Sequence, residues 1–89
     1  ALQNARHVLR ALWESAGGEQ VRLSPSVEGG VGIVFGTAGQ RYADIECFND
    51  GEVLAITSEP DAEPVVWPVN LEPDSLRQTI RRITAFLNG

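Results

Sequence analysis

The sequence predicts one α+β domain over residues 1–89, with an N-terminal helix, an antiparallel meander of three to four strands and a C-terminal helix. Two observations carry this fold class. An Asp50-Gly51 pair separates two alternating runs that are rich in β-branched and aromatic residues, and apolar residues recur at helical spacing near both ends of the chain. Because the predicted sheet has one clearly apolar face, we expect both helices to pack on that face.

The first predicted helix runs from Ala1 to about Ala16, and Gly17-Gly18 ends it. We expect Trp13 to anchor this helix in the core. Since the chain starts inside a helical pattern and contains no Met, we expect either a removed initiator or further residues upstream. The expected apolar stripe consists of Leu2, Ala5, Leu9, Leu12, Trp13 and Ala16.

The central hairpin has two possible registers. A two-residue turn at Asp50-Gly51 would pair Cys47 with Leu54 and Ile45 with Ile56, which places all four on the apolar face. A three-residue loop would shift the pairing by one residue and leave Leu54 and Ile56 on the wetter face. We favour the two-residue turn because it segregates the apolar side chains better.

The sequence patterns that predict the flanking strands are less regular than that of the hairpin. A glycine-rich strand over residues 31–37 should pair with the first strand of the hairpin, placing Ile33 opposite Ile45. Residues 65–69 read as a fourth strand, which Pro68 confines to a sheet edge. Val21 and Leu23 could add a short edge strand. The last helix should begin near Pro73, and its apolar stripe is Leu76, Ile80, Ile83 and Leu87.

Composition narrows the classes of function. Twelve acids and seven bases, all of them arginine, give a net charge of −5. An acidic domain repels phosphate backbones, so we do not expect nucleic-acid binding. No apolar run approaches the roughly 18–20 residues that a membrane-spanning helix needs. A single cysteine gives no internal disulfide, and a reducing cytoplasm is the expected location.

Pro25, the strand after Gly29-Gly30, the acid-bearing run Tyr42–Cys47 and the Asn49-Asp50-Gly51 turn together form a pattern across residues 20–58. In this pattern the chain resembles a group of small bacterial proteins. Those proteins often carry a Trp-containing, glycine-rich segment ahead of the first helix, which these 89 residues lack. The resemblance suggests a link to toxin–antitoxin or phage-defence systems. The group has no established activity, so the resemblance implies no catalytic residues.

Asp44 and Glu46 are the pair of residues in this sequence with the clearest capacity to form a binding or reactive site. They are two residues apart on a predicted strand, so both project from one face with Cα atoms about 6.5–7 Å apart. Small neighbours would leave a shelf there, with Tyr42 and Phe48 at its ends. Such a pair could bind a partner, a small ligand or a cation, or could serve as a solvated surface only.

Other candidates are weaker. Trp67 could offer an apolar edge to another chain. Arg77, Arg81 and Arg82 could meet an anion or an acidic partner, although a solvated helix face is the simpler interpretation. A nucleophile built from Cys47 and His7 is not expected, since Cys47 falls on the apolar face. One Cys with one His is too few ligands for zinc.

We therefore expect no catalytic residues, no metal site and no cofactor. The favoured hypothesis is a non-enzymatic protein–protein interaction module, in one version a small acidic inhibitor or antitoxin-like protein. It would bind a protein partner or a second copy through Tyr42, Asp44, Glu46, Phe48 and Trp67. The alternative is a small-ligand or cation-binding domain that uses the same sheet face.

Overall fold

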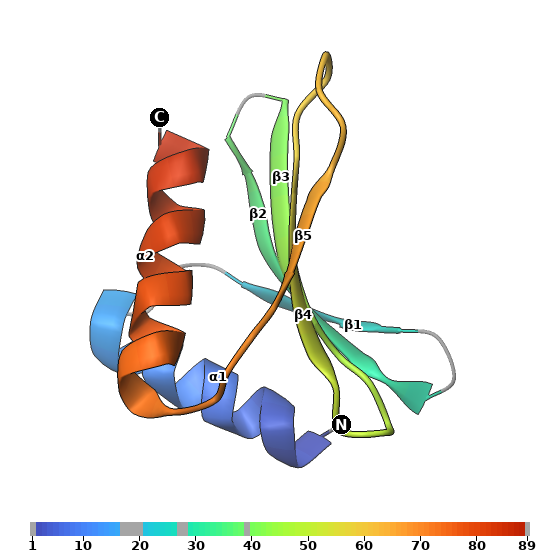
Figure 1. Ribbon diagram of the computed structural model, residues 1–89, viewed down its shortest axis with the longest axis vertical. Helices are drawn as coiled ribbons and strands as arrows, with labels where there is room; N and C mark the ends of the chain where they lie inside the picture. Colours follow the sequence, from blue (N-terminus) through green and yellow to red (C-terminus); the bar gives the residue numbers. More distant parts are fainter. Residues whose placement is uncertain (1, 17–20, 27–28, 39, 89) are drawn as a thin grey trace.

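A computed structural model describes residues 2–16, 21–26, 29–38 and 40–88. It confirms the α+β fold. The chain forms a helix, then a five-stranded antiparallel sheet with the strand order β1-β2-β3-β4-β5, then a second helix (Figure 1). The sequence predicted three to four strands and left open a short edge strand at Val21 and Leu23; β1 lies at that place. The elements are α1 (Leu2–Ala16), β1 (Arg22–Pro25), β2 (Val31–Ala38), β3 (Arg41–Cys47), β4 (Val53–Ser58), β5 (Val65–Pro68) and α2 (Pro73–Asn88).

Both helices pack on one face of the sheet, as predicted, and they also contact each other (Figure 1). Both layers contribute large side chains to the core, Ile80 and Ile83 from α2 and Ile33 and Ile45 from the sheet. The sheet also contributes the small Ala43 and Ala55, both fully buried, and these let the helices lie close to the strands. The core cluster consists of Ala5, Val8, Leu12, Ile33, Phe35, Ala43, Ile45, Cys47, Val53, Ala55, Leu76, Ile80 and Ile83.

The stripe predicted for α1 was partly wrong. Val8 is fully buried, whereas Trp13 is 72% exposed and Leu2 is 58% exposed. Trp13 lies one residue past Leu12, which is buried, so the helix turns the indole about 100° away from the core direction. The stripe predicted for α2 is confirmed, since Leu76, Ile80 and Ile83 are buried.

The register predicted for the central hairpin was wrong, and the alternative register is the one observed. Cys47 pairs with Val53 and Ile45 pairs with Ala55. The Phe48 N–H donates to the Glu52 carbonyl at 2.9 Å, and the Gly51 N–H donates to the Phe48 carbonyl at 3.1 Å. Gly51 has a φ of 92°. The loop is thus a three-residue turn that ends in a left-handed glycine, a common hairpin alternative to the two-residue turn.

Each of the two edge strands has a proline at one of its outward-facing positions. In β5 the Val69 N–H donates to the Val53 carbonyl, and antiparallel pairs alternate in hydrogen bonding, so the backbone of Pro68 faces away from β4. In β1 the Ser26 N–H donates to the Gly30 carbonyl, which by the same alternation turns Pro25 outward. A proline at an outward position removes a donor that a neighbouring strand would need. The edge position predicted for β5 is confirmed.

Candidate functional site

The sheet face opposite the helices is more apolar than the sequence predicted. The observed hairpin register turns Leu54 and Ile56 onto this face, where both are half-buried, while Val53, Ala55 and Thr57 face the core. Val66 lies on the same face and is 53% exposed. We call this surface the open face; it consists of Arg22, Ser24, Gly32, Val34, Tyr42, Asp44, Glu46, Phe48, Leu54, Ile56, Ser58, Val66 and Pro68.

Cross-strand pairing arranges the open face in rows. Asp44 lies between Val34 of β2 and Ile56 of β4, and Ile56 in turn pairs with Val66 of β5. These apolar neighbours explain why Asp44 is only 6% exposed although no helix lies over it. The next row places Glu46 between Gly32 and Leu54.

Asp44 is held by one hydrogen bond. The Tyr42 hydroxyl donates to Asp44 Oδ2 at 2.7 Å, whereas the buried Oδ1 accepts no hydrogen bond from any residue that the structure describes. The pKa of Asp44 is raised to about 6, chiefly by burial and also by the charge and hydrogen bonding of the nearby Glu46, while the hydrogen bond from Tyr42 opposes this rise. Burial, together with the bond to Asp44, raises the pKa of Tyr42 to about 12.

The Glu46 carboxylate lies near Asp44, in the adjacent cross-strand row. Ser26 donates a hydrogen bond from its hydroxyl to Glu46 Oε1 at 2.8 Å. The other oxygen, Oε2, occupies the space that a side chain on Gly32 would fill, because a Cβ built there would lie 2.5 Å from it. Gly32 therefore makes room for the Glu46 carboxylate. The structure brings together Tyr42, Asp44 and Glu46, as the sequence predicted.

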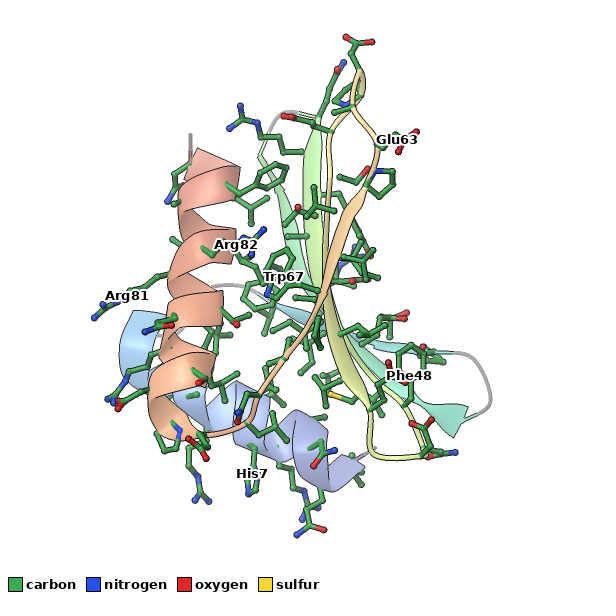
Figure 2. The ribbon with its side chains drawn as sticks, in the orientation of Figure 1. His7, Phe48, Glu63, Trp67, Arg81 and Arg82 are labelled. Atoms are coloured by element: carbon green, nitrogen blue, oxygen red, sulfur yellow. The ribbon has the colours of Figure 1, made fainter. Side chains whose placement is uncertain are left out.

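Phe48 also lies on the side of the sheet away from the helices (Figure 2). It is half-buried at the start of the hairpin loop. Trp67 lies elsewhere. Its side chain points to the helix side, packs against the core and is covered by the Arg82 guanidinium, which lies 3.7 Å from the ring centroid (Figure 2). Trp67 is thus not part of the open face.

The three arginines of α2 do not form one site. Arg77 pairs with Asp74, and Arg82 stacks on Trp67. Arg81 points away from the molecule and makes no ion pair with a described residue (Figure 2). Arg41, which the sequence analysis did not single out, bridges two elements: it pairs with Glu59 at 3.4 Å and donates to the Phe86 carbonyl at 2.8 Å.

Nucleophile and metal candidates stay apart. Cys47 is fully buried in the core and burial raises the pKa of its thiol, whereas His7 is exposed on α1 and points away from the sheet (Figure 2). Within the part of the chain that the structure describes, three or more His, Cys, Asp or Glu residues do not gather at a metal-binding distance. None of the described helices is long and apolar enough to cross a membrane.

Sequence reasoning missed Leu54, Ile56 and Val66 as members of this surface. Their strands were predicted, but the face each residue occupies depends on the hairpin loop length. The signal that could have found them is the alternative three-residue register, which turns Leu54 and Ile56 outward. Comparison with known proteins adds no further member: no family model, no curated protein and no solved structure matches the chain.

Proposed function

We propose that this domain is a non-enzymatic protein–protein interaction module that binds its partner through the open face. The observation that supports the proposal is that Val34, Ile56 and Val66 surround Asp44 in one cross-strand row, on a sheet face that neither α1 nor α2 covers. An antiparallel sheet with one free face normally turns polar side chains to water on that face. An apolar surface rimmed by polar groups is typical of a contact site for another protein.

Charge indicates the chemistry of the partner. The open face holds Asp44 and Glu46 near its middle, and the acids Glu59, Asp61 and Glu63 follow in the loop after β4. The whole chain has a net charge of −5. A partner segment with apolar side chains and basic groups would complement this surface, and its charge would speed association. A small acidic inhibitor of the antitoxin type is one form that such a module could take.

The test compares two variants that differ only in the face they alter. Val66 and Val65 are neighbours on β5 with similar exposure, 53% and 46%, but alternation places their side chains on opposite faces of the sheet. Tagged wild-type protein, V66E and V65E are each used to capture proteins from a lysate of the source cells, with identification by mass spectrometry. We expect the partner to be retained by wild type and V65E and lost with V66E.

Two outcomes would contradict the proposal. One is retention of the same proteins by all three forms, which would mean that the open face is not used. The other is loss with V65E and retention with V66E, which would place the contact on the helix side of the sheet. Circular dichroism of both variants checks that neither has unfolded.

A second candidate function is binding of a small ligand or cation at Asp44 and Glu46. The buried Asp44 Oδ1 favours it, because an oxygen without a hydrogen-bond partner could receive a ligand. Thermal unfolding with and without Mg²⁺ or Ca²⁺ tests the metal version. A saturable rise in Tm that disappears in the D44N/E46Q double variant would favour this candidate over the first.

A further inference from the structure

The centre of the open face contains a buried carboxyl group, and one of its two oxygens has no hydrogen-bond donor among the residues that the structure describes. Asp44 is more than nine-tenths buried, and its Oδ1 accepts no hydrogen bond from the described residues. A buried carboxylate oxygen without a partner is costly. It is stable only if the carboxyl group holds a proton or if another molecule supplies a donor.

The surroundings of Asp44 contain little that could neutralise it. Tyr42 and Glu46 come from its own strand, and Arg22 from β1 lies near enough to Tyr42 to lower the pKa of that phenol. The residues that β2 and β4 pair with this stretch bring no charge: they are Gly32, Val34, Leu54, Ile56 and Ser58. Neither Asp44 nor Glu46 forms an ion pair with a described arginine.

We propose that Asp44 and Glu46 together bind an arginine side chain of the partner, whose guanidinium donates to Asp44 Oδ1 and to the Glu46 carboxylate. This inference rests on the proposed interaction through the open face. Below about pH 6 the Asp44 carboxyl group holds a proton, which leaves to solvent when the arginine enters. The apolar neighbours Leu54 and Ile56 would contact the aliphatic stem of that side chain.

Arginine fits this site better than the other cations. A divalent metal ion requires about six oxygen ligands, and the described residues bring together fewer than three candidate ligand side chains at any point. A guanidinium is planar, weakly hydrated and able to donate to two carboxylates at once. The ammonium of lysine is more strongly hydrated, so it loses more on entering an apolar surface.

The test uses L-arginine amide as the probe and L-citrulline amide as its control. Citrulline has the same shape but carries a neutral urea in place of the guanidinium. The side-chain carboxyl carbons of Asp44 and Glu46 are followed by NMR in ¹³C-labelled full-length chain while each compound is added at constant ionic strength. We expect saturable shifts of both carbons with arginine amide and none with citrulline amide.

Acid should weaken the binding, because a proton competes for the same place. Since the pKa of Asp44 is about 6, affinity for arginine amide should fall about thirtyfold between about pH 7.5 and about pH 4.5. D44N and E46Q should each lower the affinity at least tenfold, by about 1.4 kcal/mol or more. Glu72→Gln removes an equal charge from an exposed position just before α2 and should leave the affinity unchanged.

Three results would overturn the inference: equal shifts with both compounds, undiminished binding to D44N, or stronger binding at about pH 4.5 than at about pH 7.5. The absence of any saturable shift up to tens of millimolar probe would overturn it as well. These results are separable from the capture experiment. If the V66E variant loses the partner while arginine amide fails to bind, the open face is an interaction surface and only its arginine anchor is wrong.

Discussion

Replacing Asp44 by asparagine should stabilise the protein at neutral pH. The wild-type carboxyl group is buried between Val34 and Ile56, so its ionised form is disfavoured in the folded state and its pKa is raised from 3.8 to about 6. An asparagine has the same shape and stays neutral at every pH. Its amide can accept the bond from Tyr42 and donate to Glu46.

The direction of the pH dependence follows from the sign of this shift. Because the folded-state pKa of Asp44 is the higher one, the protonated carboxyl favours the folded state fully below about pH 4, and this contribution is lost as the pH rises through about 6. The difference between the folded and unfolded pKa of Asp44 corresponds to at most about 3 kcal/mol. Because the charge of the nearby Glu46 contributes to that difference, the measured effect should be smaller than this limit.

The assay is urea unfolding of wild type and D44N between about pH 4 and about pH 8, followed by tryptophan fluorescence. We expect similar free energies of unfolding at the acid end and a growing advantage of D44N above about pH 6. The Glu63→Gln variant, which changes the same charge on an exposed loop, serves as the control. The reasoning is refuted if D44N is the less stable protein at about pH 7.5, or if its difference from wild type does not change with pH.

Three further predictions concern elements outside the site. Gly51→Ala should lower the free energy of unfolding by about 1–2 kcal/mol, because Gly51 has a φ of 92°. An added Cβ would meet nothing within 4 Å, so the backbone conformation alone causes this loss. An unchanged urea midpoint would contradict the three-residue loop. Arg82→Ala should lower the free energy of unfolding by about 0.5–1 kcal/mol through loss of the stack on Trp67. The control, Arg81→Ala, should change it by less than about 0.5 kcal/mol. Equal effects would mean that the stack does not contribute. Pro68→Val restores an outward N–H on an edge strand and should increase self-association, measured by sedimentation velocity. Identical sedimentation profiles of wild type and variant would show that this proline does not protect the edge.

Much of the fold could be predicted because local patterns decide it. Helix α2 has an apolar stripe of Leu76, Ile80 and Ile83 whose spacing fits no other element, and these residues are buried. The pairing of Ile33 with Ile45 also followed from alternation alone and is confirmed. In each case one period explains the apolar residues that face the core, although in β2 it leaves Val34 on the opposite face.

The hairpin register could not be settled in this way. An Asp-Gly pair suits both a two-residue turn and the last two positions of a three-residue loop. Preference for the larger residues Leu54 and Ile56 in the core led to the wrong choice. In the structure the small Ala55 faces the helices and lets them approach the sheet, while Leu54 and Ile56 lie on the opposite face. That constraint is tertiary and does not appear in the sequence of the hairpin.

The candidate site could be predicted only in part: its residues were identified, but its burial was not. The two-residue spacing of Asp44 and Glu46 placed both carboxyl groups on one face, and the structure brings them together with Tyr42. The burial of Asp44 was not predictable, because it depends on Ile56 lying beside it, and Ile56 reaches that face only in the three-residue register. The error in loop length therefore also hid the apolar character of the surface.

The central claim is that a partner covers the open face, and methyl NMR tests it most directly. The chain is labelled on its Ile, Leu and Val methyl groups, and a protein captured by wild type and lost with V66E is titrated into it. The account predicts shifts or broadening at Leu54, Ile56 and Val66 on the open face, with little change at Ile80 and Ile83 in the core. Changes confined to the exposed Leu2 of α1, with the open-face methyls unmoved, would contradict it.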